Sequence, residues 1–275
     1  MLSLIAALLV RGGPAPNPPV GSIRINPYFG GSHQPATMPG AAQQGGNAMA
    51  GRRPPKHVVI LCHPEEGSFN ASVAERYCAT VRTIGHEVVL RDLYAMGFDP
   101  VLRAREQPGR ADFELSSDVA EELTLLSGAS VFVLVYPIWF GAPPAMLKGY
   151  VERVLGAGFT HRNVRDRAFH PIAEGAHLLS FTSSGTTSQW LSEQGAMLSL
   201  RQVFDEYIKN AFSFASTDHV HFSAIVKGTR ANYIRECLAE VEQKARTIAS
   251  IAARDGWRSA RVSVPAADDP SPHSG

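Results

Sequence analysis

Residues 129–137, ASVFVLVYP, form the most apolar segment of the part of the chain that has a regular pattern. A continuous apolar and β-branched run of this length is typical of a parallel strand that is buried on both faces. The segment HVVILC at 57–62 has the same character. We therefore expect residues 129–137 to form the central strand of a parallel sheet.

Strand-like and helix-like segments alternate along the chain from Lys56 onward. Apolar runs predict strands at 57–62, 86–92, 129–137, 176–182 and 219–225. Helical spacing predicts a first helix with a core face of Val73, Tyr77, Val81 and Ile84, and later helices at 117–128, 145–155, 192–212 and about 234–251. The stretch 93–117 has no strong period and predicts a long loop. Five strands alternating with helices predict an α/β fold with a parallel, doubly wound sheet.

The two ends of the chain differ from this pattern. Residues 1–54 start with the apolar run MLSLIAALLV and continue with sequence dense in Gly, Pro, Gln and Asn. Ten apolar residues cannot span a bilayer, so we expect no transmembrane segment. Sequence without periodic apolar residues cannot bury enough surface to offset its ordering entropy, so we expect 1–54 and 262–275 to be disordered. An over-long start, with Met49 as the first residue, is the alternative for the N-terminal part.

Composition and charge exclude several classes of protein. The 275 residues are 44% hydrophobic and carry 26 basic against 25 acidic residues, a net charge of +1. This balance lacks the basic footprint of a nucleic-acid-binding protein. Cys62, Cys78 and Cys237 are too few and too far apart for a disulfide framework or a tetrahedral metal site, so we expect no metal and a reducing cytoplasm.

Three loops with unusual chemistry follow predicted strands, at 63–70 (HPEEGSFN), 136–141 (YPIWFG) and 182–187 (TSSGTT). In an open α/β sheet a ligand binds beyond the carboxyl ends of the strands, so we expect these loops to converge on one crevice. The first loop precedes a helix N-terminus, which favours a phosphate. Neither GxGxxG nor GxxxxGK[ST] is present, which excludes the Rossmann and P-loop interpretations.

Each loop also has a structural interpretation. Ser68 or Asn70 can be an ordinary helix cap, and TSSGTT can be a plain turn rich in hydroxyl groups. Trp139 and Phe140 suit the wall of a flat aromatic ligand, but a patch for dimerisation or helix packing is the alternative.

Taken together, HPEEGSFN, DLY followed by FDPVL, YPIWFGAPPAMLKGYVERVLGAGF and FTSSGTT resemble the flavodoxin-like NAD(P)H:quinone oxidoreductase family. This family includes bacterial modulators of drug activity and ancillary oxidoreductases of potassium-efflux antiporters. The resemblance covers about residues 56–212. It implies a flavodoxin-like, three-layer fold with strand order 2-1-3-4-5 and a flavin-binding domain at 55–255.

The resemblance also implies an activity and partners. A flavin would be reduced by NADPH or NADH and reoxidised by a quinone-like acceptor. The flavin would be FAD, with FMN as the alternative because the chain is too short for the full C-terminal segment that holds the adenine end of FAD. The protein would be a cytoplasmic homodimer. A regulatory flavoprotein subunit of a membrane potassium-efflux system, with incidental turnover, is the alternative. An electron-carrying flavodoxin is a third hypothesis, which the charge of +1 disfavours because such carriers are usually acidic.

Site residues follow from the matching motifs. By motif position, the flavin contacts would be His63, Ser68, Phe69 and Asn70 for the ribityl and phosphate part, Pro137, Ile138, Trp139 and Phe140 for the ring edge, and Thr182, Ser183, Ser184 and Gly185 for the pyrimidine end. The residues expected beside the reacting atoms are Trp139, Phe140 and His161.

The chain departs from the family at two positions. Trp190 stands where mammalian members have a tyrosine that assists proton movement, and their histidine has no clear counterpart in SEQGAMLSL at 192–200. Proton delivery is therefore open. His161 stands where a substrate-lining tyrosine is expected; it is a candidate acceptor-site residue, and a solvated loop histidine is the alternative.

Overall fold

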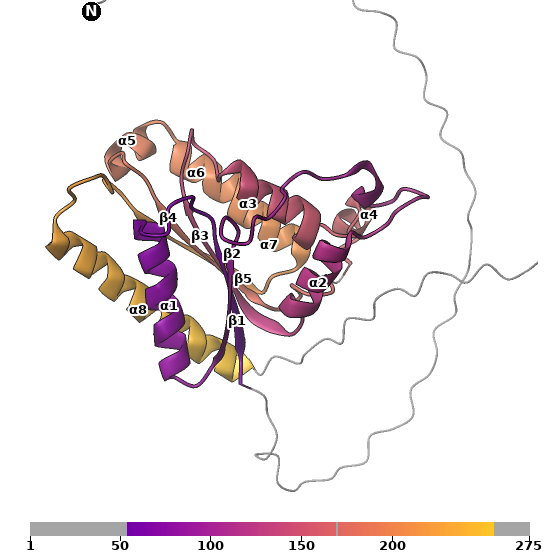
Figure 1. The fold of residues 1–275 in the computed structure, drawn as a ribbon, viewed down its shortest axis with the longest axis horizontal. Coiled ribbons are helices and arrows are strands. Elements are labelled where there is room, and N and C mark those ends of the chain that lie inside the picture. The colour runs from indigo at the N-terminus through magenta and orange to yellow at the C-terminus, as the bar shows by residue number, and fades with distance from the viewer. Residues whose placement is uncertain (1–53, 169, 256–275) are drawn as a thin grey trace, which may run out of the picture. The chain divides into compact units, whose positions relative to one another are not determined.

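The computed structural model describes residues 54–168 and 170–255 (Figure 1). The predictions for the tail 262–275 and for 1–53 lie outside the described residues. The strands are β1 Lys56–Leu61, β2 Glu87–Asp92, β3 Ala129–Pro137, β4 His177–Ser183 and β5 Ser216–Phe222. The α-helices are α1 Phe69–Thr83, α2 Ser117–Leu126, α3 Ala145–Tyr150, α4 His161–Arg165, α5 Ser188–Glu193, α6 Ala196–Leu200, α7 Tyr207–Phe212 and α8 Ala231–Asp255. A 3₁₀ turn covers Ala104–Glu106, and π-helical segments cover Val151–Leu155 and Arg201–Glu206.

The five strands form one parallel sheet in the order β2-β1-β3-β4-β5. This order confirms the flavodoxin-like arrangement. β3 lies at the centre, and all nine of its residues are buried. Its apolar side chains pack into the core on both faces of the sheet. A continuous apolar run is therefore required, and this run identified the strand in the sequence.

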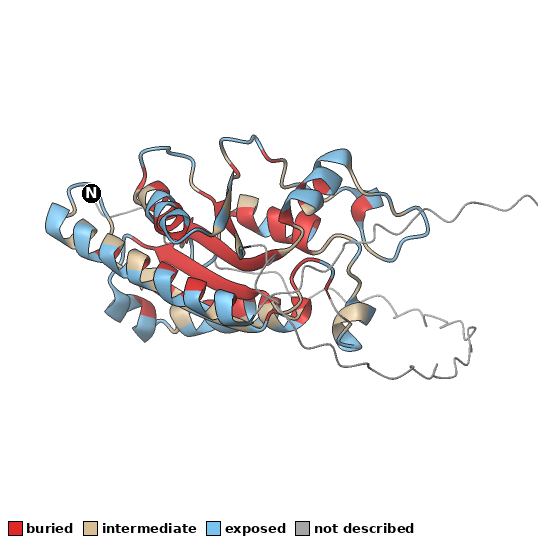
Figure 2. Ribbon diagram, turned by 90° about the horizontal axis from the view of Figure 1, so that it is seen from below, coloured by how far each residue is buried: buried red, intermediate tan, exposed pale blue. Residues whose placement is uncertain are grey.

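Helices cover both faces of the sheet and complete three layers. Figure 1 shows α1 and α8 on one side and α2, α3, α6 and α7 on the other. Each side has its own apolar core: α1 and α8 pack on alternate residues of β1, β3, β4 and β5, and the other helices pack on the intervening residues. Figure 2 shows the strands buried and the outward helix faces exposed.

The fifth strand differs from the prediction. It spans Ser216–Phe222, three residues earlier than 219–225, and pairs only with β4. Residues 216–218 are polar and carry no apolar strand pattern, but the backbone of β4 still pairs with them at the sheet edge. After Phe222 the chain turns, and Ala224 has a left-handed φ of 55°. The predicted end of the strand is therefore a loop.

Two helix predictions also need correction. The expected single helix at 192–212 is interrupted at Gly195, which has φ 65° and precedes α6. Ile84 is the C-terminal cap of α1 and is 39% exposed, so it does not lie on the core face. Apolar spacing alone does not show where the last helical turn loses contact with the sheet.

Among the described residues, no helix is both long enough and apolar enough to cross a membrane.

Candidate functional site

The carboxyl ends of β1, β3 and β4 open onto a cavity of about 740 Å³. Strand order reverses between β1 and β3, and this is the place where doubly wound sheets bind ligands. The cavity brings together most of the predicted cofactor residues: His63, Ser68, Phe69, Asn70, Pro137, Ile138, Trp139, Ser183, Ser184 and Gly185. The three loops, distant in sequence, therefore share one cavity.

One end of the cavity is the N-terminus of α1. Ser68 is the N-cap, and its Oγ accepts a hydrogen bond from the Ala71 backbone N–H at 3.1 Å. The backbone N–H groups of the first helical turn point out of the helix and, with the helix dipole, favour an anion. A Cβ built on Gly67 would meet no heavy atom within 4 Å, so the glycine leaves space at this end of the cavity. The local sequence thus builds an anion cradle.

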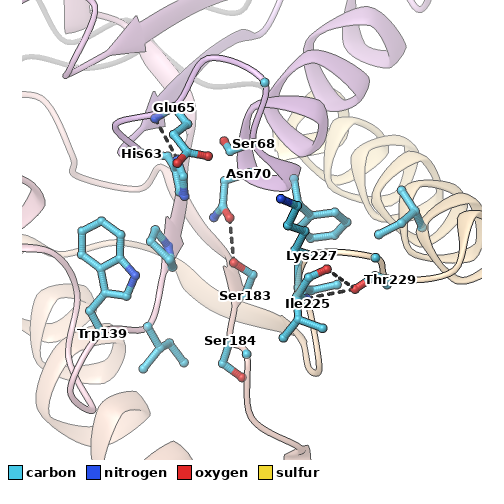
Figure 3. A pocket seen from close by; sticks show the side chains of 18 residues that line it. His63, Glu65, Ser68, Asn70, Trp139, Ser183, Ser184, Ile225, Lys227 and Thr229 are labelled. Atoms are coloured by element: carbon cyan, nitrogen blue, oxygen red, sulfur yellow. Dashed lines mark hydrogen bonds between the residues drawn. The ribbon is translucent and has the colours of Figure 1, made fainter.

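Asn70 connects this end to β4. The Ser183 hydroxyl donates to Asn70 Oδ1 at 2.7 Å, and both side chains are buried. This bond fixes the amide plane. Figure 3 shows the Asn70 amide nitrogen turned to the side on which His63 and Trp139 lie. The amide can therefore donate a hydrogen bond to a ligand in the cavity.

The opposite wall is aromatic. The rings of His63 and Trp139 lie with their centroids 6.0 Å apart. Trp139 is 41% exposed, and its backbone pairs with Ala142 across a tight turn in two 3.0 Å hydrogen bonds. The Ile138 N–H donates to the Ser183 carbonyl at 2.7 Å, which ties this loop to β4. The wall is rigid and suits a planar ligand.

Phe140 lies at the tip of that turn and does not line the cavity. It has φ 52° and Gly141 has φ 79°, the left-handed pair that a type I′ turn requires. The turn directs the Phe140 side chain to solvent, where it is fully exposed. A bulky residue with positive φ is strained, typically by about 1–3 kcal/mol, and such strain is concentrated at functional sites.

Two other predicted site residues also lie away from the cavity. Thr182 is 1% exposed, and its hydroxyl is hydrogen-bonded to His219 and His221. His161 is the first residue of α4; it is exposed and does not line the cavity. The structure therefore places the acceptor-site candidate His161 outside the cavity.

Sequence reasoning missed the loop that follows β5. Residues 225–229, IVKGT, line the cavity beside α1. Figure 3 shows the Lys227 side chain reaching toward the N-terminal end of α1, and Lys227 makes no ion pair with the described residues. Its ammonium group adds positive charge to the anion cradle. The Lys-Gly pair at 227–228 could have indicated a loop at the carboxyl end of a strand. The predicted strand extended to residue 225, so the start of this loop was assigned to the strand.

Metal and thiol chemistry have little support in the described part of the chain. No group of three or more His, Cys, Asp or Glu side chains there is placed to hold a metal ion. Burial raises the pKa of the Cys62 thiol to about 12, so this neighbour of the cavity stays protonated at neutral pH.

Two curated proteins are similar to this chain. An uncharacterized NAD(P)H oxidoreductase of Haemophilus influenzae is 29% identical over 60% of this chain and 81% of its own length. NAD(P)H dehydrogenase [quinone] 1 of Rattus norvegicus is 33% identical over 48% of this chain. The match spans 55% of the rat protein, about half its length.

Solved structures and a family profile match as well. An NAD(P)H:quinone oxidoreductase from Methanothermobacter marburgensis has a TM-score of 0.61 at 24% identity, covering 71% of this chain and 96% of that one. An FMN-dependent NADH-azoreductase from Bacillus anthracis, in complex with FMN, has a TM-score of 0.53 at 16% identity, covering 71% and 99%. At these identities the similarity shows a shared fold. Residues 55–248 match the profile of the family described as having a flavodoxin-like fold, and the chain belongs to that family.

Proposed function

We propose that this protein is a flavin-dependent NAD(P)H oxidoreductase that reduces quinone-like acceptors, with residues 55–255 as the flavin-binding domain. One observation carries the proposal: a single cavity joins an anion cradle at α1 to an aromatic wall at Trp139. The names of the Haemophilus, rat and Methanothermobacter proteins support this activity.

The residues of the cavity fit a flavin from end to end. Ser68, the first N–H groups of α1 and Lys227 would hold the phosphate. Asn70 would donate to the ribityl chain or the ring edge. His63 and Trp139 would flank the ring and exclude water from one side. A bound flavin supplies hydride transfer between a nicotinamide and an acceptor, so the protein need provide no nucleophile.

FMN is the first cofactor to test. The sequence resemblance pointed to FAD with FMN open, but a solved structure that shares this fold, the Bacillus anthracis azoreductase, contains FMN. The cavity accounts for a phosphate and a ring, and nothing in the described residues marks a separate adenine site. Either NADH or NADPH is compatible with the proposal.

We also propose a homodimer in a reducing compartment, the cytoplasm. Large apolar side chains stay exposed on α5, α6, the π-helical segment Arg201–Glu206 and α7: Trp190, Leu198, Val203 and Tyr207. A second copy of the chain would cover them. All three cysteines are free and buried, which suits a reducing environment. A monomeric mass in light scattering at micromolar concentration would contradict the dimer.

Flavin binding is the direct test. Purified protein, stripped of any bound cofactor, should bind added FMN and give the visible absorbance of a protein-held flavin. Trp139→Ala should weaken binding by roughly 1–3 kcal/mol, about 5-fold to 150-fold in Kd, because it removes one wall. Leu125→Ala is the control, since Leu125 on α2 is 43% exposed, close to the 41% of Trp139, and does not line the cavity.

Two outcomes decide between the hypotheses. Absence of binding with both FMN and FAD would remove the basis of the proposal. Rapid NAD(P)H-dependent reduction of a quinone by the loaded protein would support an enzyme, whereas binding without appreciable turnover would favour the regulatory alternative. No feature of the described residues favours that alternative.

A further inference from the structure

A continuous chain of side-chain hydrogen bonds runs from a buried carboxylate to the cavity. Asp205 Oδ2 lies 2.5 Å from His219 Nδ1, and His219 Nε2 lies 2.7 Å from Thr182 Oγ1. Thr182 Oγ1 lies 2.9 Å from His221 Nδ1, and His221 Nε2 lies 3.1 Å from Ser184 Oγ. Ser184 lines the cavity. We call these five residues the β4–β5 chain.

The fold places these residues on one face of the sheet. β4 and β5 pair in parallel, with Thr182 opposite His221. Because alternate residues of a strand share a face, His219 and His221 point to the same side. The π-helical segment Arg201–Glu206 packs on this side and brings Asp205 to His219. The polar side chains on this face of the edge strand β5 are thereby linked into one hydrogen-bonded chain.

The deep end of the chain is buried. Asp205 is 2% exposed, and the His219 side chain is 4% exposed. A buried carboxylate is costly unless it is paired. Its partners here are His219 Nδ1 and the Ser180 hydroxyl, which donates to Asp205 Oδ1 at 2.9 Å. An additional proton on the His219 ring would therefore lie next to a carboxylate.

The hydrogens along the chain can be arranged in two complete ways. With His219 protonated, it donates to Asp205 and Thr182, Thr182 donates to His221 Nδ1, and His221 Nε2–H donates to Ser184. With His219 neutral, the Thr182 hydroxyl donates to His219 Nε2, His221 Nδ1–H donates to Thr182, and Ser184 donates to His221 Nε2. Every bond of the chain survives in both. In the first arrangement the Ser184 hydroxyl hydrogen is left for an acceptor outside the chain, which is the Thr186 carbonyl at 3.1 Å in this structure. The two arrangements differ by one proton, which leaves through Ser184.

We propose that the β4–β5 chain is a proton relay that delivers a proton from His219 to a ligand in the cavity. This inference rests on the proposed function, which supplies the hydride from a nicotinamide. A quinone-like acceptor that takes up a hydride becomes a hydroquinone anion, and one proton from Ser184 completes the hydroquinone. Ser184 is refilled from His221, His221 from Thr182, and Thr182 from His219, which ends neutral and bonded to Asp205. A solvent proton that enters the cavity at Ser184 and passes along the same bonds in the opposite direction restores the cationic form.

The relay supplies what the sequence left open. Trp190 stands where the resembling family has a proton-moving tyrosine, and an indole carries no proton that is acidic enough to take part. Ser184 is the member that meets the ligand. Thr182, His219 and His221 act through it.

The surroundings of His221 keep its ring neutral. Burial, followed by the positive charges of His219 and Arg201, lowers the pKa of His221 to about 4. On the same face lie the Asp205 carboxyl group and the hydroxyls of Ser180, Thr182 and Ser184. Asp218 and Lys244 pair on the α8 side of the sheet. His221 is therefore neutral at pH 7 and able to pass a proton on.

Nuclear magnetic resonance of the flavin-free protein tests the relay without turnover. At pH 7 the ¹⁵N shifts should show His219 doubly protonated and His221 as the Nε2–H tautomer. Thr182→Val removes the shared hydroxyl and should abolish the coupling between the two titrations, whereas Thr182→Ser should retain it. A neutral His219 at pH 7 in the unmodified protein, or titrations that are already independent there, would overturn the relay even if the valine variant failed to fold.

Rapid mixing of the FMN-loaded protein tests delivery into the cavity. In Thr182→Val the reduction of a quinone at pH 8 should slow by about 10-fold to 100-fold and lose its solvent deuterium isotope effect, while Thr182→Ser should keep both. An unchanged rate in a valine variant that binds FMN normally would overturn the inference. Failure of every variant and of the unmodified protein to bind a flavin would instead contradict the proposed function, and the resonance experiment would still decide whether the relay exists.

Discussion

The two faces of the sheet differ in how they accommodate buried titratable side chains. On the side of α1 and α8 the core is almost wholly apolar, and its most deeply buried titratable pair is neutral: His57 Nδ1 lies 2.8 Å from the Tyr77 hydroxyl. On the other side a charged pair is buried, Arg153 with Glu106, and Asp205 is buried in contact with His219. The face that carries charge also carries the relay to the cavity. Apolar packing holds the sheet, and paired charges position the functional side.

Electrostatics show the same contrast. Burial lowers the pKa of His57 to about 3, so that side chain stays uncharged. On the other face, hydrogen bonds from the Arg153 guanidinium lower the pKa of Glu106 to about 2, so that carboxyl stays charged. Arg153 also donates to Asp118 and to the Asp99 carbonyl, and its side chain is 3% exposed. Each face avoids an uncompensated charge, one by neutrality and the other by pairing.

Arg153→Ala should have the largest effect. It leaves the Glu106 carboxylate, which is 4% exposed, without its partner and detaches the long 93–116 loop, so the free energy of unfolding should fall by about 3–5 kcal/mol. Denaturant unfolding followed by circular dichroism measures the loss. Arg110→Ala is the control, since Arg110 pairs with Asp112 at the exposed surface and should change stability little. Equal losses of stability in the two variants would show that the buried Arg153–Glu106 pair matters no more than an exposed ion pair.

Lowering the pH should have the next largest effect on stability, through His57 on the side of α1 and α8. In the unfolded chain His57 has its ordinary pKa of 6.5, and in the fold it is about 3, so between these values the unfolded state binds more protons. The stabilisation is complete above pH 6.5 and is lost as the pH falls toward 3. From pH 7.5 to pH 4.5 the loss from His57 should be roughly 2–3 kcal/mol.

Urea unfolding of the native chain and of His57→Gln over this pH range isolates the effect. His170 and His221, whose pKa values burial lowers to about 4, add losses of the same sign in both proteins. The stability difference between the two proteins should therefore shrink as the pH falls. A difference that stays constant with pH would show that His57 does not resist protonation.

Tyr150→Phe should have the smallest effect on stability. It tests which partner, Tyr150 or Arg91, compensates the buried Glu122 carboxylate. The Tyr150 hydroxyl donates to Glu122 Oε1 at 2.7 Å, but Arg91 also binds both Glu122 oxygens, at 2.8 and 2.6 Å. The carboxylate keeps its main partner, so the loss should be about 1–2 kcal/mol in the same unfolding assay. A loss as large as that of Arg153→Ala would mean that the tyrosine, and not the ion pair, compensates the Glu122 charge.

Much of the cavity could be predicted because its loops follow recognisable strands. Residues 57–62 and 129–137 are continuous apolar runs, so their carboxyl ends, and hence His63 and Trp139, could be placed at one sheet edge before the structure was known. The site residues that did not reach the cavity were displaced by details of backbone geometry. Phe140 follows a left-handed turn to solvent, and Thr182 is one residue out of phase with Ser183 along β4.

The sequence by itself determined the buried strands, their alternation with helices and the three loops at their ends, because burial on both faces imposes a local pattern that can be counted along the chain. The tertiary structure alone decided the start of β5, the approach of Lys227 to α1 and the linkage of Asp205, His219, Thr182, His221 and Ser184. These features depend on which polar residues become neighbours across the sheet. Pairing between strands has no local period, so only the folded backbone specifies it.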